Sequence, residues 1–354
     1  MVFGFGKSKT DNKAGNAAAA KPAAAAAPAD IPPGQMMGLM QDWPLTVNRV
    51  LEHAAIAHPH REVVTRSVEG PIIRQTYKDI YDRARQCSTA LKEDGVQMGD
   101  RVATLAWNTG RHMEAWYGTM CIGSVLHTLN PRLHPEQIAW IMNHAGDSVL
   151  FFDLTFLPIV QAIHQHVPGC RRYILFTDDA HMPADHGIPN LVSYETYIAG
   201  KSMDVKWGDF DENTACGLCY TSGTTGDPKG VLYSHRSNVL HTMIGMQPDA
   251  IGGGVKDTML PVVPMFHANA WGITFSAPAS GMKLVMPGAK MDGESIYELL
   301  DGEKVTTTAA VPTVWLMLLQ YLEQTGKKLP HLQKVVIGGS AVPERILRAF
   351  EEKY

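Results

Sequence analysis

Short apolar runs alternate along the first half of the chain with longer segments in which apolar residues recur every three or four positions. The runs predict strands and the periodic segments predict helices. The expected strands are 102–106, 124–128, 149–152 and 173–176, and the expected helices are 113–121, 135–143 and 157–166. Strand, helix and strand in this order are typical of crossover units, which build a parallel sheet. We therefore expect an α/β fold with largely parallel sheets flanked by helices.

The second half of the chain continues the same rhythm. Expected strands are 218–220, 283–286 and 335–337, and expected helices are 237–246, 294–300, 311–325 and 343–352. Near the start, Val47, Val50, Leu51 and Ala54 recur at helical spacing. Thr46 precedes them and is the candidate N-cap of a first helix.

Residues 1–34 differ from the rest of the chain in composition. They contain two alanine runs, 17–20 and 23–27, and almost no large apolar side chains. Such a segment cannot bury a core. We expect a disordered Ala/Pro-rich tail over 1–34 and a folded domain over 35–354.

The overall composition excludes several classes of protein. The 354 residues are 45% hydrophobic and 19% charged, so the chain as a whole is not disordered. A net charge of −4 gives no broad electrostatic reason to expect binding to nucleic acid or to an anionic membrane. Without a run of about 18 apolar residues or a signal peptide's apolar core, the expected location is the cytoplasm.

The five cysteines do not suggest a disulfide framework, because their number is odd and they are spread along a long chain. Cys216 and Cys219 have the spacing of a redox or zinc pair, but they lie in an apolar run without a second ligand pair. We interpret them as buried strand cysteines. The histidine pairs His58/His60 and His164/His166 also lack ligand partners at metal spacing and are interpreted as surface residues.

The richest chemistry lies in residues 220–231, which follow an apolar run. Glycines let backbone N–H groups approach an anion closely, while hydroxyls and one lysine add donors and positive charge. These residues are Thr221, Ser222, Gly223, Thr224, Thr225, Gly226 and Lys229. The pattern predicts a cradle for the phosphates of a nucleotide, although it is not the common P-loop, because Pro228 precedes Lys229. The alternative is an ordinary solvated hairpin.

Residues 220–231 resemble the signature of the adenylate-forming superfamily, which includes acyl-CoA synthetases and luciferases. Segments 260–272, 285–288, 310–315 and 336–341 also fit, as do 43–46, 106–108 and 130–133. Within 260–272, the sequence Phe-His-Ala-Asn-Ala-Trp is similar to the fatty acyl-CoA synthetase form. The resemblance implies an α/β fold, the large N-terminal domain of such an enzyme, from about residue 36 to residue 354.

The resemblance also implies a reaction and a set of site residues. A carboxylate attacks the α-phosphate of MgATP to give an acyl-adenylate, and coenzyme A then displaces AMP to give a thioester. Thr221 is expected to bind Mg²⁺, Ser222 to Gly226 to hold the phosphates, and Lys229 to steady the departing pyrophosphate. His267 is expected beside the carboxylate, and Trp271 to gate an acyl tunnel. The sites that bind the substrates are expected to be lined by Ala268, Gly338, Gly339 and Ser340.

Ordinary structural roles are the alternatives for two of these residues. His267 could be a packed core histidine, and Trp271 could be a core tryptophan. Trp315 and the residues 316–319 that follow it are interpreted as core.

The resemblance covers only part of the family's length. The adenine- and ribose-binding segments and the small C-terminal domain with its catalytic lysine are expected beyond residue 354, so we interpret the chain as a fragment that is inactive alone. The leading hypothesis is a ligase for medium- or long-chain fatty acids. Alternatives are a ligase for short acids or methylthiopropionate, and a non-catalytic module that binds nucleotide or acyl groups. A homodimer is expected from the family alone.

Overall fold

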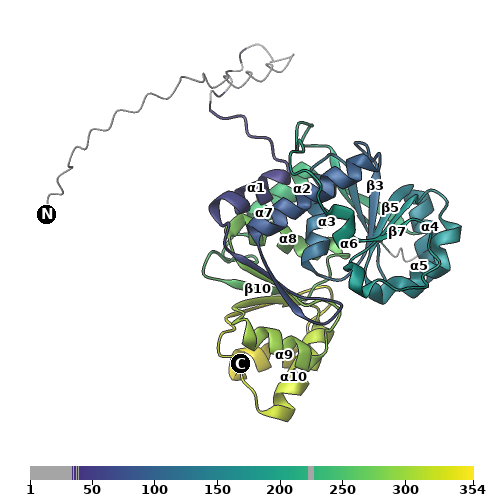
Figure 1. The fold of residues 1–354 in the computed structure, drawn as a ribbon. Coiled ribbons are helices and arrows are strands. Elements are labelled where there is room, and N and C mark those ends of the chain that lie inside the picture. Colours follow the sequence, from purple (N-terminus) through teal and green to yellow (C-terminus); the bar gives the residue numbers. More distant parts are fainter. Residues whose placement is uncertain (1–33, 35, 37, 39, 222–226) are drawn as a thin grey trace, which may run out of the picture. The chain divides into compact units, whose positions relative to one another are not determined.

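The computed structural model describes residues 34, 36, 38, 40–221 and 227–354 (Figure 1). The chain divides into two compact units, Met1–Trp43 and Pro44–Tyr354. The described residues before Pro44 belong to no helix or strand. The tail expected over 1–34 lies, apart from Gly34, outside the described residues.

The first sheet of the larger unit has the strand order β7-β6-β5-β3-β4-β8-β9 within the described residues. Neighbouring strands are parallel except β8 and β9, which are antiparallel. The strands are β3 (Arg101–Leu105), β4 (Val125–Thr128), β5 (Asp147–Phe152), β6 (Arg172–Leu175), β7 (Leu191–Ser193), β8 (Ala215–Thr221) and β9 (Lys229–Ser234).

Helices cover both faces of this sheet (Figure 1). On β5, Leu150 and Phe152 pack on one face with side chains of α4 and α5, whereas Val149 and Phe151 pack on the other with α2, α3 and α6. Burial on both faces explains why these strands read as continuous apolar runs. The helices are α2 (Tyr77–Glu93), α3 (Gly110–Met120), α4 (Pro135–Ala145), α5 (Leu157–Ile163) and α6 (Tyr194–Ile198), with 3₁₀ turns η1 (Leu154–Phe156), η2 (His164–His166) and η3 (Asp179–His181).

The second sheet has the order β13-β12-β10-β11-β1-β2 within the described residues, with only the β1–β2 pair antiparallel. Its strands are β1 (Glu62–Arg66), β2 (Ile72–Thr76), β10 (Thr258–Pro261), β11 (Lys283–Met286), β12 (Thr307–Ala310) and β13 (Lys334–Ile337). Side chains of α9 (Gly293–Gly302), α10 (Pro312–Thr325) and α11 (Glu344–Lys353) cover one face. Trp315, which is fully buried there, confirms its interpretation as core.

A third group of helices shares a core with both sheets. It comprises α1 (Asn48–Ala57), α7 (His235–Gly245) and α8 (Ile273–Ser280), with the turn η4 (Ala268–Gly272) before α8. In this core the rings of Trp116 and Phe275 lie 5.7 Å apart, and the Tyr117 hydroxyl donates to the Thr274 carbonyl. Apolar packing therefore joins α3 of the first sheet to α8 before β11 of the second.

The order of the first sheet places a topological switch point between β3 and β5. The chain passes from β3 to β4 on one side, and then crosses to β5 on the other side of β3. The loops that follow β3 and β5 therefore run in opposite directions from the carboxyl edge. In open α/β sheets this divergence leaves a crevice in which ligands bind.

These elements confirm the predicted α/β fold with largely parallel sheets, but one local prediction is wrong. Helix α1 begins at Asn48 with Val47 at its N-cap, and no side chain caps it. The Thr46 hydroxyl oxygen is buried and has no hydrogen-bond partner among the described residues. Fully buried Val47 packs into the core, and this packing fixes the entry to the helix more strongly than the hydroxyl does.

Candidate active site

The predicted phosphate cradle lies between two antiparallel strands. Thr221 ends β8 and lies opposite Lys229, which begins β9. The Thr221 hydroxyl donates to the Lys229 carbonyl oxygen at 3.5 Å, and both side chains are exposed. The residues between them that were predicted to hold phosphate, Ser222, Gly223, Thr224, Thr225 and Gly226, lie outside the described residues. The structure thus places the two ends of the cradle.

A polar network that the sequence did not indicate lies beside Thr221. The Tyr220 hydroxyl is 2.6 Å from His144 Nδ1, and its ring lies 5.2 Å from the ring of His127. His127 Nδ1 contacts the Asp147 carboxylate at 2.8 Å, and both side chains are fully buried. Burial raises the pKa of Asp147, although the His127 imidazole acts in the opposite direction. These residues lie on different elements, so no local motif could have revealed them.

The two cysteines of β8 are buried and reduced, which confirms the interpretation as strand residues. Cys216 Sγ is 3.1 Å from Asn238 Nδ2, and Cys219 Sγ is 3.1 Å from Thr128 Oγ1. Burial raises the pKa of Cys216 to about 12. Because the thiolate is the reactive form, this thiol is protonated and inert at neutral pH.

The segment that follows His267 has an unusual backbone. Ala268, Asn269, Ala270 and Trp271 all have positive φ, between 45° and 54°. Such left-handed geometry costs a non-glycine residue about 1 kcal/mol or more. Buried Asn269 holds the turn by donating from Nδ2 to Asn238 Oδ1 of α7 at 3.3 Å. Strained turns of this kind persist where surrounding contacts over-determine them, and they cluster at functional sites.

Among the predicted site residues, His267 and Ser340 are exposed, and their side chains make no hydrogen bond to any described residue. His267 is therefore not a packed core histidine. Its backbone N–H donates to the Pro264 carbonyl at 3.1 Å, which orients the chain before the strained turn.

Trp271 packs against Gly338, the first residue after β13. A Cβ atom on Gly338 would lie 3.0 Å from Cη2 of the indole, a tight contact that would require the ring to shift by a few tenths of an ångström. Gly339 has a φ of +83°, which also favours glycine. The sequence suggested that the bare backbone of Gly338 leaves room for the adenylate, whereas here the indole ring lies against it.

A cavity of about 430 Å³ lies beside this tryptophan. Its lining comes from two segments of the chain, 233–241 and 268–272. The lining residues are Tyr233, Ser237, Asn238, His241, Ala268, Asn269, Trp271 and Gly272. Trp271 is half-buried and borders open space, so it does not have the environment of an ordinary core tryptophan.

Asn108 links this region to the other sheet. Its Nδ2 donates to the carbonyls of Pro261 and Val263 at 2.8 and 2.9 Å, and its Oδ1 accepts from the Met265 N–H at 2.7 Å. Asn108 follows β3 and is fully buried. One side chain from the first sheet therefore satisfies the backbone that leads to His267.

Two features are absent from the described part of the chain. Residues 40–221 and 227–354 contain no cluster of three or more His, Cys, Asp or Glu side chains that could hold a metal ion. In the same part, no helix combines the length and the apolar character needed to cross a membrane.

The two-sheet α/β architecture and the hydroxyl- and lysine-bearing hairpin define a domain of the adenylate-forming class. The chain belongs to the family of AMP-binding enzymes, whose sequence model matches residues 51–354. It is 44% identical over 319 residues to the 3-methylmercaptopropionyl-CoA ligase of Ruegeria lacuscaerulensis, covering 90% of this chain and 59% of that protein. It is 45% identical to the medium-chain-fatty-acid–CoA ligase of Ectopseudomonas oleovorans, covering 90% of this chain and 58% of that one. The chain thus spans less than two thirds of the length of these curated relatives.

Solved structures agree on the fold. The anthranilate CoA ligase AuaEII in complex with anthranoyl-AMP superimposes with a TM-score of 0.78 at 21% identity, covering 88% of this chain and 58% of that one. The N-terminal domain of FACL13 from Mycobacterium tuberculosis superimposes with a TM-score of 0.73 at 23% identity, covering 87% of this chain and 73% of that one. At these identities the match shows the fold alone.

Proposed function

We propose that this chain provides the nucleotide- and acid-binding part of an ATP-dependent acyl-CoA ligase. The observation that carries the proposal is the family match over residues 51–354, together with relatives at 44% and 45% identity that are named as CoA ligases. In the proposed reaction a carboxylate attacks ATP to give an acyl-adenylate and pyrophosphate. Coenzyme A then releases AMP and forms the thioester.

The ends of the β8–β9 hairpin suit the triphosphate in this reaction. Thr221 offers a hydroxyl and Lys229 an ammonium group, and both are exposed on neighbouring strands. Mg²⁺ commonly keeps several waters and takes few protein ligands beside the phosphates, so one hydroxyl such as that of Thr221 fits its needs. When bound, the ion would neutralise charge on the phosphates. Lys229 would bind the same oxygens as a mobile point charge.

The strained turn and its cavity suit the acid. His267 projects from the turn with both ring nitrogens unengaged by described residues, so it can bond to the oxygens of a carboxylate. Trp271 borders the cavity of about 430 Å³ and lies against Gly338. Rotation of the indole away from Gly338 would open a path along that backbone.

The proposed acid is a medium- or long-chain fatty acid, because a cavity of this volume beside an indole can bury a hydrocarbon chain. A second candidate is methylthiopropionate, which the relatives named 3-methylmercaptopropionyl-CoA ligase favour at 43% and 44% identity. A third is a non-catalytic module that binds the nucleotide or the acyl group. Its ligand contacts would be the same, and only turnover would differ.

Binding is tested by thermal shift and calorimetry on residues 1–354, with decanoyl and methylthiopropionyl sulfamoyl-adenosine as stable mimics of the acyl-adenylate. A ligand that binds only the folded state raises the melting temperature by mass action. Lys229→Ala and Trp271→Ala are expected to weaken binding, whereas Lys92→Ala, an exposed lysine of α2, serves as the matched control. If neither mimic binds, the proposal fails.

Turnover is tested in a completed protein, in which residues 1–354 are joined to the remaining part of a ligase of the relatives' length, by ATP-dependent hydroxamate formation from a panel of acids. A preference for acids of eight or more carbons would support the fatty-acid assignment, and a preference for methylthiopropionate would replace it. Tight binding of a mimic without hydroxamate formation would favour the non-catalytic module.

A further inference from the structure

The switch point of the first sheet holds a cavity distinct from the proposed active site. Its volume is about 330 Å³, and its lining includes Thr109 after β3, Asp153 after β5 and Phe176 after β6. The β1–β2 hairpin closes another side with Thr65 and Glu69. None of these side chains lines the cavity beside Trp271. The cavity therefore lies where the topology of an open α/β sheet places a ligand.

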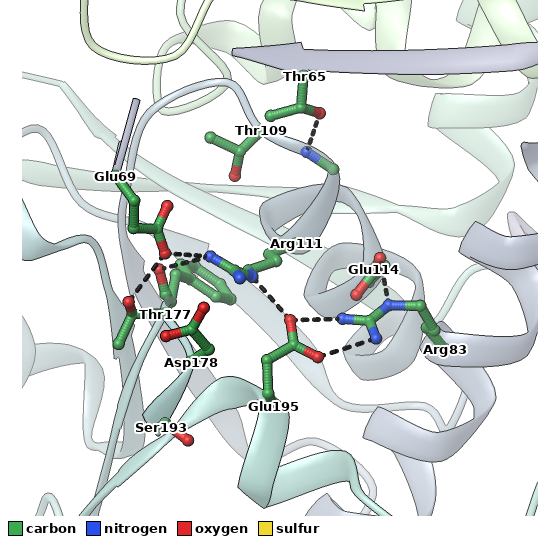
Figure 2. Close-up of polar contacts among 12 residues, drawn as sticks. Thr65, Glu69, Arg83, Thr109, Arg111, Glu114, Thr177, Asp178, Ser193 and Glu195 are labelled. Carbon is green, nitrogen blue, oxygen red and sulfur yellow. Dashed lines mark hydrogen bonds and ion pairs between the residues drawn. The ribbon is translucent and has the colours of Figure 1, made fainter. Parts of the chain in front are cut away.

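A network of ion pairs forms the floor of this cavity (Figure 2). Arg111 contacts Glu69 at 2.6 Å and Glu195 at 2.9 Å. Arg83 contacts Glu195 at 3.0 Å through two parallel bonds, and Glu114 at 2.9 Å. Two guanidinium groups thus face three carboxylates, which leaves the network with an excess of one negative charge.

Two carboxylate oxygens in the network, Glu69 Oε2 and Glu114 Oε2, are buried without a hydrogen-bond partner among the described residues, and of these two residues only Glu69 lines the cavity. Glu69 Oε1 accepts from Arg111 and from the Thr177 hydroxyl, whereas Oε2 is buried and accepts no hydrogen bond from another described residue. The Glu69 side chain is only 4% exposed. In Figure 2 this second oxygen turns away from Arg111 and toward Thr109. A buried carboxylate oxygen without a donor is costly, so it marks the position of a missing donor.

A fourth carboxyl group borders the same space. Asp153 is 1% exposed, and its Oδ2 accepts from the Trp107 N–H at 2.7 Å. Burial above all, and the nearby negative charge of Glu69, raise its pKa, whereas the bond from the Trp107 N–H and the charge of Arg111 lower it, and the resulting pKa is about 7. A positive charge beside both carboxyl groups would remove this repulsion.

The remaining charged groups do not supply that positive charge. Arg74 lines the cavity but pairs with Glu62 and Glu303 outside it. Asp79, the other lining carboxylate, is engaged by the Thr76 backbone as a helix cap.

We propose that this cavity binds a small organic cation, a primary ammonium compound, whose N–H groups donate to Glu69 Oε2 and Asp153. An ammonium group carries three donors and one charge, which matches the orphan oxygen and the excess of carboxylates. The side chains of Val68, Ile73 and Phe176 offer an apolar surface for the carbon chain of such a compound. This inference does not depend on the proposed ligase function.

Other ligand classes fit less well. An anion at the start of α3 would need free backbone N–H groups, but the Gly110 N–H donates to Thr65 Oγ1 at 3.0 Å and the His112 N–H to Thr109 Oγ1 at 3.2 Å. A tightly held metal ion would need more ligands, and no metal-binding cluster occurs among the described residues.

The test is a titration of residues 1–354 with propylammonium chloride at constant ionic strength, followed by saturation-transfer NMR. Propan-1-ol, which has the same carbon chain and no charge, is the matched control ligand. Glu69→Gln and Asp153→Asn remove one charge each, and Glu136→Gln removes an exposed charge from α4 as the control variant. Thermal melts report whether each variant folds. If Glu69→Gln does not fold, the binding measured for Asp153→Asn decides the result.

The proposal predicts saturable binding of propylammonium, weak or no binding of propan-1-ol, and about tenfold weaker binding for Glu69→Gln and Asp153→Asn. Glu136→Gln should bind like the wild type. Equal binding of both ligands, or equal weakening by Glu136→Gln, would overturn it. So would inorganic phosphate or Mg²⁺ that displaces propylammonium from this cavity, because the site would then belong to another ligand class.

Discussion

The β8–β9 hairpin and the switch-point cavity differ in the burial and pairing of their charged side chains. At the hairpin, Thr221 and Lys229 are exposed, and the Lys229 ammonium has no ion-pair partner among the described residues. In the cavity, Arg111 and Glu69 are mostly buried and paired. A group that must meet a triphosphate has to stay free until the ligand arrives. A charged group that is paired with its neighbours instead stabilises the fold. Only those of its hydrogen-bonding atoms that lack a partner are available to a ligand.

The comparison has an energetic consequence. Removing an exposed, unpaired group changes little in the folded protein. Removing one member of a buried ionic network leaves an uncompensated charge and costs much more. Mutations at the hairpin should therefore affect chemistry, and mutations in the cavity should affect stability.

The largest expected effect is that of Arg111→Ala. This change leaves Glu69 and Glu195 without a shared cation, so the free energy of unfolding should fall by about 3–5 kcal/mol. Urea denaturation measures the loss. The matched control is Arg348→Ala, whose exposed pair with Glu344 on α11 should contribute about 1 kcal/mol or less. Similar losses for both variants would remove the distinction between the two regions.

Lys229→Ala should have the next largest effect, on activity alone. Loss of one charge that stabilises the leaving pyrophosphate should lower the rate of adenylation about 100-fold. The melting temperature should stay within about 1 °C of the wild type, because the side chain is exposed. Pyrophosphate exchange in the active ligase measures the rate. A normal rate in Lys229→Ala would exclude the proposed role.

A smaller effect is expected in the pH dependence of stability. Burial holds the pKa of Asp153 at about 7 in the folded protein, whereas an unfolded aspartate titrates near ~3.9. The folded state therefore keeps a proton that the unfolded state releases, and its stability falls as the pH rises between about pH 4 and pH 7. Asp153→Asn removes this term, so the variant should gain stability relative to the wild type as the pH rises. Urea denaturation across this range would show a constant difference if Asp153 titrates normally.

The smallest effect is expected for the cysteines of β8. Cys216→Ala and Cys219→Ala should retain adenylation, because both thiols are buried and neither faces the cradle as a thiolate. In the folded protein Cys216 should resist alkylation by iodoacetamide, and urea should make it reactive. A loss of activity as large as that of Lys229→Ala would contradict the structural role.

Local sequence pattern predicted strands such as β11, in which large apolar side chains follow one another. The strand expected over 283–286 is β11. It could be predicted because its large side chains are buried on both faces, Leu284 and Met286 in one core cluster and Val285 in another. In contrast, β12 (Thr307–Ala310) was missed because threonines and alanines carry no strong apolar signal, although all four residues are buried. The β1–β2 hairpin was missed because β2 has exposed and half-buried residues, which resemble a loop.

The candidate site shows the same limit. Thr221, Lys229 and His267 could be proposed as site residues because each lies in a continuous stretch of sequence that resembles a family motif. The cavity could not be found in this way, because Glu69 lies in the β1–β2 turn, Arg111 in the first turn of α3 and Asp153 after β5, and they meet only through the strand order. Their chemistry arises from topology, which local periodicity does not encode.

The side chain of Asn108 fixes how the chain that leaves β10 aligns with the loop that follows β3. Its amide bonds to Pro261, Val263 and Met265 at once, so the chain leaving β10 can take only the register in which all three backbone groups are met. A slip by one residue would leave buried donors and acceptors unmatched. The position of His267 is thus set by a side chain more than 150 positions earlier in the chain, and a change of that amide would displace this histidine without touching it.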